Sequence, residues 1–331
     1  MIKNFTVSVT SDKIWNLAQL LDFLIANQQS HIRLHINPEA ICLKNVGLYC
    51  WLDKFQFNQV EIFTSNPLER HDYYRINYFK HYNWFEKIET INPLLHKWNQ
   101  SKIFYCLFGR PTASRLGLAA YLLSHHAQHT HIHFSAIPHI DRLVDFELDK
   151  LLEYRTASIG EAGDLINQLP ILLSSTEKYT RFNGFDYTDP LTQLYQDILI
   201  DVLVESHVLG NTFYPTEKTI RPMWLKKSFI IFSSKNYLDY LHQMGFRTFA
   251  DFWSEEYDGY EGRDRFLMIL ELIDNLAKKS NKELEKMHSA MQYTLDHNYN
   301  LLKTQSYNKT IQYIDQWKIQ ANQNLCLLQS R

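Results

Sequence analysis

Residues 103–108 read IFYCLF, and this uninterrupted apolar run decides the fold class. Such a run is typical of a parallel strand that is covered on both faces of its sheet. It is broken at residues 109–111, Gly-Arg-Pro, after which Thr112 or Ser114 can cap a helix. We therefore expect a strand, a loop and a helix in that order, with the loop at the carboxyl edge of a sheet.

The rest of the chain repeats this alternation of short apolar runs and amphipathic stretches, which predicts an α/β protein. Strands are expected at 5–9, 31–36, 49–55, 60–64, 131–135 and 228–233. Helices are expected at 13–27, 236–244, 264–279 and 281–298, with a last helix at 308–328.

Composition limits the classes of protein to consider. The chain has 331 residues, enough for two domains, and a formal net charge of -2, so no overall charge draws it to nucleic acid or to an anionic membrane. Its four cysteines form no CxxC pair, which favours a reducing compartment. No signal peptide and no apolar run of the ~18 residues that span a bilayer are recognised, so a cytoplasmic location is expected.

The second informative stretch is 205–234, in which Thr216-Glu217-Lys218 precedes an expected helix. Proline is tolerated in the first turn of a helix, so Pro222 predicts that the regular helix begins close to Thr219. A carboxylate at Glu217 can accept two ribose hydroxyls, and an ammonium at Lys218 can neutralise a diphosphate near the helix start. From the residues alone, a surface cap with solvated charges is the alternative.

This stretch resembles the signature region of α1,3-fucosyltransferases and related GT-B glycosyltransferases. Residues 245–249, Gly-Phe-Arg-Thr-Phe, and 252–253, Phe-Trp, resemble uncharacterised glycosyltransferase-like proteins of phages and large viruses. In the fucosyltransferases a Glu-Asn pair precedes a loop, an aromatic-X-Thr-Glu-Lys run, a helix and an apolar strand. The counterparts here are Glu205-Ser206, with Ser in place of Asn, then residues 214–218, the helix and 228–233. The resemblance implies that Glu217 holds the donor ribose and Lys218 its phosphates.

The resemblance also implies other donor-binding residues. Arg115, with Arg110 as the second choice, matches an arginine that contacts the diphosphate, and arginine can grip phosphate oxygens bidentately. An ordinary surface arginine paired with a carboxylate is the alternative. Glu205, Thr216 and Arg221 complete the predicted donor site, although Arg221 and Pro222 stand where the fucosyltransferases carry small or apolar residues.

The implied architecture is two Rossmann-like domains that face a cleft, with a C-terminal helix that crosses back. We expect an acceptor-side domain at 1–98, a donor-binding domain at 99–303 and a helix at 304–331 that packs on the first domain. The general base of an inverting transfer should come from the first domain. Glu69, His71 and Asp72, in the loop after the strand that ends at Thr64, are the candidates.

No metal or separate cofactor is expected, because the Asp-X-Asp motif of metal-dependent glycosyltransferases is not recognised. Three histidines, His129, His131 and His133, alternate along one expected strand. Such a row does not suit the tetrahedral cluster that zinc prefers. The basic residues of the donor site would stabilise the leaving diphosphate instead.

The expected function is the transfer of a sugar from a nucleotide-diphosphate sugar to an acceptor hydroxyl, with inversion and without metal. The acceptor, whether a glycan, a protein or a DNA base, is left open. One alternative is a DNA-base-modifying glycosyltransferase of phage type, which the near-neutral charge disfavours and a basic strip on the first domain would favour. The other is a nucleotide-binding module without catalytic activity.

Overall fold

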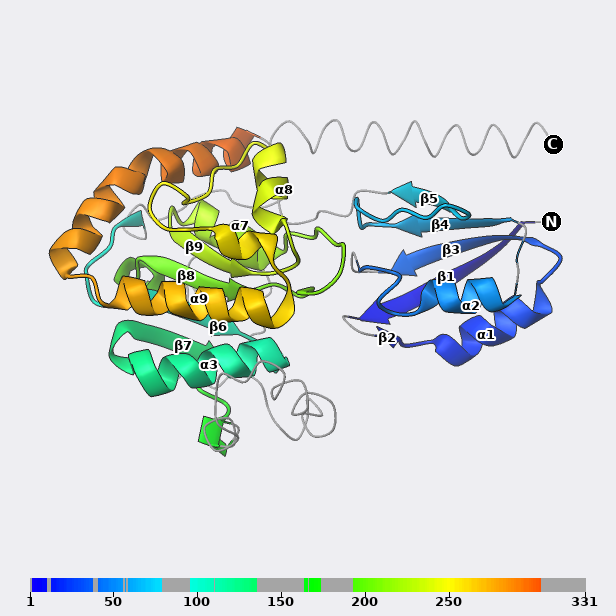
Figure 1. Ribbon diagram of the computed structural model, residues 1–331, viewed down its shortest axis with the longest axis horizontal. Coiled ribbons are helices and arrows are strands. Elements are labelled where there is room, and N and C mark those ends of the chain that lie inside the picture. Colours follow the sequence, from blue (N-terminus) through cyan, green and yellow to red (C-terminus); the bar gives the residue numbers. More distant parts are fainter. Residues whose placement is uncertain are drawn as a thin grey trace.

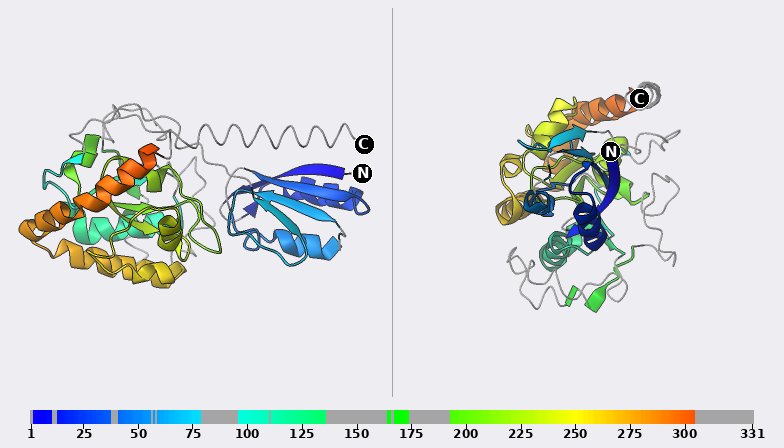
Figure 2. Two further views of the ribbon diagram at one scale, coloured as in Figure 1. Left: turned by 90° about the horizontal axis from the view of Figure 1, so that it is seen from above. Right: turned by 90° about the vertical axis from the view of Figure 1, so that its right-hand side faces the viewer.

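The computed structural model describes residues 2–10, 13–37, 41–55, 57, 59–78, 96–109, 111–135, 164–165, 167–173 and 193–304. These residues form two α/β units that lie end to end along the molecule, each with its own sheet (Figure 1, Figure 2). We call the described residues up to 78 the first unit and those from 96 onward the second unit. The predicted boundaries at 98/99 and 303/304 stay predictions, and the terminal helix lies, from residue 305 on, outside the described residues.

The first unit has a five-stranded sheet of order β2-β1-β3-β4-β5. Strands β1, β3, β4 and β5 are parallel, and β2 is antiparallel to β1. The elements are β1 (Ile2–Thr10), β2 (Lys13–Ile14), α1 (Leu17–Ala26), β3 (His31–Asn37), α2 (Leu48–Phe55), β4 (Val60–Thr64) and β5 (Arg75–Tyr78).

The parallel strands of the first sheet follow one another in chain order. Because such crossovers are right-handed, successive helices fall on the same face, and α1 and α2 do so (Figure 1). That face holds the first core, with Leu34 and Ile62 fully buried and in register. The alternate positions face the other way: His35 is exposed and its ring stacks on Phe63 at a centroid distance of 4.8 Å. The first sheet therefore has one buried face and one polar face.

The second unit has a parallel four-stranded sheet of order β7-β6-β8-β9. Residues 281–304 form a further helix. The other elements are β6 (Phe104–Phe108), α3 (Ala113–His126), η2 (Ala127–His129), β7 (Thr130–Phe134), η3 (Leu194–Asp197), β8 (Ile200–Val204), α7 (Glu217–Trp224), β9 (Ser228–Phe232), α8 (Tyr237–Gln243), η4 (Glu256–Gly259) and α9 (Gly262–Ala277).

In the second sheet the chain moves outward from the centre in both directions. The crossover from β6 to β7 runs one way and that from β8 to β9 runs the other, so α3 and α7 cover opposite faces. All five residues of β8 and all five of β9 are buried. The predicted α/β class and the buried strands around 103–108 and 228–233 are thereby confirmed.

The stretch expected as a strand at 49–55 is helix α2, so that prediction was wrong. Its aromatic residues suit either state, but its buried side chains, Leu48, Tyr49 and Leu52, have helical spacing. The helix expected from residue 13 begins only at Leu17, because residues 13–14 pair with the end of β1.

Helix α7 begins at Glu217, two residues before the predicted start. Thr216 caps it, since its hydroxyl accepts the Lys218 amide at 3.2 Å. Pro222 consequently lies inside the helix, which ends two residues later at Trp224. The strong cap and this early end allow the short helix to hold a proline that lacks the usual N–H donor.

Candidate functional site

The most promising site lies where the second sheet changes its winding direction, between the carboxyl ends of β6 and β8. Ligands of open α/β sheets bind at such switch points. The β6–β8 ladder pairs Phe104 with Ile200 and Tyr105 with Asp201, whereas the β8–β9 ladder includes all five residues of each strand. The recorded β6–β8 pairing thus stops short of the carboxyl ends. The loop after β8 starts at this edge and leads into α7 (Figure 1).

Arg115, in the first turn of α3, joins the two strands at this edge. Its guanidinium is buried and donates a hydrogen bond to the Val204 carbonyl at 3.1 Å and a longer one to the Glu205 carbonyl at 3.5 Å. The predicted phosphate-binding arginine therefore lies at the switch point, with backbone carbonyls among its partners. Arg110, the second choice, lies outside the described residues.

Glu205 is the centre of the loop that follows β8. It is only 2 % exposed, and its carboxylate accepts the Thr216 amide at 3.0 Å and the Thr216 hydroxyl at 2.6 Å. The hydroxyls of Thr219, at 2.5 Å, and Tyr237, at 3.3 Å, donate to the same carboxylate. Charge-assisted bonds of this kind are strong, so Glu205 fixes the start of α7 rather than offering free oxygens to a ligand.

The predicted donor residues Thr216, Glu217 and Lys218 form one connected group at the start of α7. The Lys218 ammonium donates to the Thr216 hydroxyl at 3.1 Å and pairs with the Glu217 carboxylate at 2.8 Å. The Glu217 side chain is 36 % exposed and that of Lys218 is 16 % exposed. Glu205 thus holds Thr216 in place, while the side chains of Glu217 and Lys218 remain partly exposed to solvent.

The pKa of Glu217 reflects this pairing. Burial acts to raise the pKa, but the Lys218 charge and its hydrogen bond act in the opposite direction, and the pKa is lowered overall. Glu217 is therefore ionised at neutral pH. A carboxylate accepts hydrogen bonds only, which suits the paired hydroxyls of a ribose.

Arg221, which we predicted to be a donor-binding residue, is buried in the second unit. Its buried guanidinium pairs with Asp201 at 3.1 Å and donates to the Tyr195 hydroxyl. Burial acts to lower the pKa of Arg221, but Tyr195 and Asp201 raise it overall, so the charge persists. The ion pair therefore joins α7 to β8 inside the second unit, and Asp201 balances the positive charge of Arg221.

The three candidate bases of the first unit differ in their surroundings. Glu69 is buried and accepts the Leu43 amide at 3.0 Å and the Tyr49 hydroxyl at 2.7 Å. The His71 Nδ1 accepts the amides of residues 73 and 74 at 3.2 and 3.3 Å, so a neutral ring carries its proton on Nε2. Of the three candidates, only Asp72 is exposed.

The loop before α7 also touches the first unit, which the sequence analysis did not anticipate. The Asn66 side-chain amide donates to the Asn211 carbonyl at 2.9 Å, and its oxygen accepts the Phe213 amide at 3.4 Å. In return, the Asn211 side chain donates to the Leu68 carbonyl at 3.1 Å. Asn66 follows β4, so segments that follow strands of both sheets meet here; the β1 and β3 arrows also point toward the second unit (Figure 1).

Gly210 makes this approach possible. Its φ is +80°, and a Cβ at this position would lie 2.3 Å from the Asn45 side-chain nitrogen and 2.9 Å from Cys42 Cβ. The Gly-Asn pair at 210–211 signals a turn in the sequence, but nothing local shows that the turn meets residues more than a hundred positions away.

The turn after β9 also lies at the carboxyl edge of the second sheet, and a buried arginine holds it in place. Arg265 of α9 is fully buried and donates to the Ser234 carbonyl at 2.8 Å, while pairing with Asp258 at 2.8 Å. Asp258 also accepts the Leu238 amide at the start of α8, at 3.0 Å. Sequence analysis missed this group, because an arginine inside an amphipathic helix usually indicates an exposed position.

Neither the protein-family models nor the curated proteins contain a match to this chain. Across the described ranges, no helix has the length and apolarity to cross a membrane. Among those same residues, no group of three His, Cys, Asp or Glu side chains is placed to hold a metal ion, and His131 lies instead beside Asp197 at 3.5 Å.

Proposed function

We propose that this chain is a glycosyltransferase of GT-B architecture that moves a sugar from a nucleotide-diphosphate sugar to an acceptor hydroxyl. One observation carries the proposal: the capped start of α7 presents an ionised carboxylate and an ammonium at the carboxyl edge of a parallel sheet, directly after a loop that contacts the first unit. Edges of this kind, with a helix start beside them, bind nucleotide phosphates in other α/β folds.

The donor would lie across the start of α7. Glu217 would accept the two ribose hydroxyls, and the Lys218 ammonium would turn from Glu217 toward the diphosphate. The helix dipole favours negative charge at the same point. Arg115 adds a positive charge at the switch point, although carbonyl oxygens already hold its guanidinium. Arg221 contributes little, because Asp201 neutralises it.

The transfer itself needs few groups. The acceptor oxygen attacks the anomeric carbon, the bond from that carbon to the phosphate oxygen breaks, and the nucleoside diphosphate leaves with both bonding electrons. Lys218 and the helix start stabilise the charge that develops on the leaving group. The acceptor proton goes to a base of the first unit, for which Asp72 is the exposed candidate.

The test is a thermal-shift series on the full chain with UDP-, GDP-, CMP- and dTDP-sugars. Ligands that bind only the folded state raise its stability by mass action, by about 2.7 kcal/mol at a hundredfold excess over Kd. We expect at least one donor to raise the unfolding temperature, and Glu217→Ala and Lys218→Ala to abolish the rise without unfolding the chain. If no sugar nucleotide has any effect, the proposal fails.

Lys226→Ala is the matched control. Lys226 follows the opposite end of α7 and, like Lys218, pairs with a carboxylate, that of Asp296 at 2.7 Å. Its loss should therefore leave the donor effect intact. Release of nucleoside diphosphate, measured with the same donor, separates an enzyme from a module that only binds.

The DNA-base alternative gains little from the described part of the first unit. Arg33 and Arg75 do lie on the open face of the first sheet, but both pair with Glu61 between them, at 2.7 and 3.2 Å. This arrangement is not the continuous basic strip that phosphate contacts require.

A further inference from the structure

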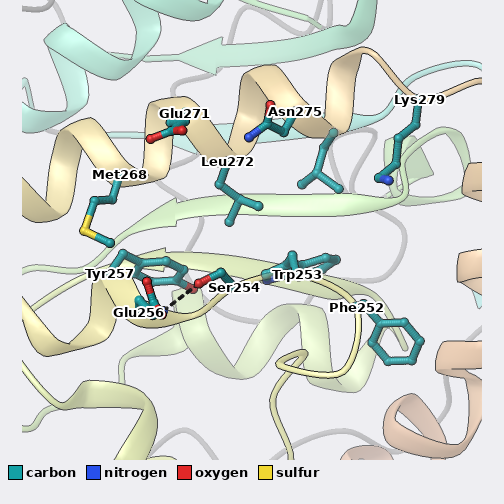
Figure 3. A pocket seen from close by; sticks show the side chains of 11 residues that line it. Phe252, Trp253, Ser254, Glu256, Tyr257, Met268, Glu271, Leu272, Asn275 and Lys279 are labelled. Carbon is teal, nitrogen blue, oxygen red and sulfur yellow. Dashed lines mark hydrogen bonds between the residues drawn. The ribbon is translucent and has the colours of Figure 1, made fainter.

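The contact between the two units is built around one buried asparagine, Asn66. A hollow of about 360 Å³ between α9 and the loop that contains η4 is no part of this contact, because its lining, from within residues 252–257 and 268–279, belongs to the second unit alone (Figure 3). Asn66 follows β4 in the first unit and is fully buried. A buried amide must find partners for both its donors and its acceptor, and Asn66 finds them in both units.

The partners of the Asn66 side chain fix it in one orientation. Its amide nitrogen faces acceptors only: the Asn211 carbonyl at 2.9 Å, and the Glu69 carboxylate and the Ile41 carbonyl, both at 3.3 Å. Its amide oxygen accepts the Phe213 amide of the second unit at 3.4 Å, and the Leu68 amide of its own unit at 3.2 Å. Exchanging the nitrogen and the oxygen would set donors against donors. The amide therefore reads both units at once and fits only in this pose.

On the side of the first unit, Asn66 stands at the start of the segment with the three candidate bases. We call residues 69–72 the base loop. Glu69, its first residue, touches the Asn66 amide and is itself held by the Leu43 amide at 3.0 Å and the Tyr49 hydroxyl at 2.7 Å. The backbone N–H of Asn66 donates to the Thr64 hydroxyl at 3.1 Å. Whatever fixes Asn66 thus fixes the beginning of the base loop as well.

On the other side, the second unit holds the loop before α7 by itself. The Ser234 hydroxyl donates to the Thr212 carbonyl, and the Phe213 ring packs on Tyr237 at a centroid distance of 5.1 Å. The Tyr237 hydroxyl in turn donates to Glu205, the residue that anchors the start of α7. The first unit is therefore attached to a segment that already has a fixed position relative to the donor residues.

We propose that Asn66 is a positioning residue, which sets the base loop of the first unit against the donor residues at the start of α7. This inference rests on the sugar transfer proposed above. Because Asn66 is fully buried, it acts through its neighbours and not on the substrates. Since the second unit alone holds Thr216, Glu217 and Lys218, the loss of Asn66 should spare donor affinity and lower the rate of transfer.

The first test separates these two quantities in the full chain, with a donor that the thermal-shift series selects. Asn66→Ala should lower kcat, measured as release of nucleoside diphosphate, at least about tenfold, because misplacing reacting groups by about 1 Å can cost about a hundredfold. The donor Kd, measured by calorimetry, should change by less than about twofold, as expected when only the arrangement in the transition state is lost.

Asn211→Ala tests the same contact from the second unit. Its side chain is exposed, and the substitution removes the hydrogen bond to the Leu68 carbonyl while keeping the backbone carbonyl that Asn66 uses. We expect a smaller fall in kcat, an unchanged donor Kd and an unchanged unfolding temperature. This variant keeps the test decisive if Asn66→Ala does not fold.

Asn298→Ala is the matched control. Asn298 is 1 % exposed, and its amide likewise pairs with one backbone donor and one backbone acceptor, the N–H and the carbonyl of Arg247, both at 2.8 Å. Both residues belong to the second unit, so this variant loses a buried amide of the same kind without altering the contact between the units. It should lower the unfolding temperature, as Asn66→Ala does, and leave kcat unchanged.

A second measurement needs no donor. Spin labels are attached to Cys50, which is exposed on α2, and to Glu261→Cys, at an exposed position just before α9, in a chain that carries Cys326→Ser. The other cysteines of the described residues are buried. We expect double electron–electron resonance to give one narrow distance between the units in this chain and with Asn298→Ala, and a broader distribution with Asn66→Ala.

Three results would overturn the proposal. A distance distribution that stays narrow in Asn66→Ala would show that other contacts fix the two units. An unchanged kcat would show that the position of the base loop does not depend on Asn66. A donor Kd that rises as much as kcat falls would make Asn66 a support of the donor site itself. If no sugar nucleotide binds, the proposed function fails, whereas the distance distribution still decides whether Asn66 holds the units, so the two failures are distinguishable.

Discussion

In the first unit the parallel strands cross the sheet in chain order, whereas in the second the chain starts at the centre and leaves in both directions. This difference decides which faces are covered. The first sheet has helices on one face, and β3 alternates between buried and more exposed residues. The second has helices on both faces, and every residue of β8 and β9 is buried. The order of the strands thus explains why β3 alternates between buried and more exposed residues, whereas β8 and β9 are buried throughout.

The same difference explains where the candidate site lies. A sheet wound in one direction has no switch point, but the second sheet has one between β6 and β8. Arg115 and Glu205 meet at this point. The first unit contacts the loop before α7 through Asn66, which follows β4 at the carboxyl edge of the first sheet.

The largest expected effect comes from one substitution made in three places. Ile230→Ala in β9 and Ile36→Ala on the covered face of the first sheet should each cost about 4 kcal/mol of unfolding free energy, because both side chains are almost fully buried. Ile2→Ala, at a 37 % exposed position of β1, should cost under about 1 kcal/mol. Urea unfolding measures all three.

Equal costs for Ile2 and Ile36 would show that the open face of the first sheet is covered in solution. That result would remove the contrast between the two sheets.

The next effect concerns pH and the amino end of the second sheet. Lys227 is 1 % exposed, and burial lowers its pKa to about 7, while its amine donates to the carbonyls of Lys97 and Ile198 at 2.6 and 3.1 Å. Above pH 7 the unfolded chain holds this proton and the folded chain does not. Stability should therefore rise with pH from 7 toward 10.5, by up to about 1.4 kcal/mol per pH unit.

Lys227→Met removes the titrating group and should flatten this rise. The measurement is the free energy of unfolding of both proteins at several values between pH 7 and 9. Parallel curves would mean that Lys227 keeps its charge in the folded state.

The smallest of the three effects compares the two buried carboxylates, one in each unit. Glu205→Gln and Glu69→Gln each replace an acceptor oxygen by an amide that faces hydrogen-bond donors, so each should cost about 2 kcal/mol. Only Glu205→Gln should also abolish the donor effect in the thermal-shift series, because Glu205 holds the start of α7. Loss of the donor effect in both variants would mean that the donor site extends across the two units.

Sequence patterns were sufficient for the elements that burial dominates. Continuous apolar runs located β6 and β9, and the strands expected at 5–9 and 31–36 lie within β1 and β3. The pattern failed at 49–55, where aromatic residues permit a strand but side-chain packing selects helix α2. It also misplaced the start of α7, because a proline rule outweighed the cap that Thr216 provides.

The sequence predicted the position of the candidate site in the chain, but not which side chains would contact one another there. Thr216, Glu217 and Lys218 do lie together at a helix start, as the local order of residues predicts. The partners of Glu205 include Tyr237, and those of Arg221 include Asp201 and Tyr195, all distant in the chain. Such pairings depend on how strands and helices meet, which a single sequence does not record.

The loop from 205 to 216 contacts both units: Glu205 anchors the start of α7 in the second unit, and Asn211 contacts Asn66 in the first unit. If a ligand at one end of this segment changes the affinity for a ligand at the other end, the coupling between the two is reciprocal. A ligand at the start of α7 that raised the affinity of the first unit for a second ligand would have its own affinity raised by that ligand by the same factor. Cooperativity between two substrates would then need no part of the protein beyond this loop.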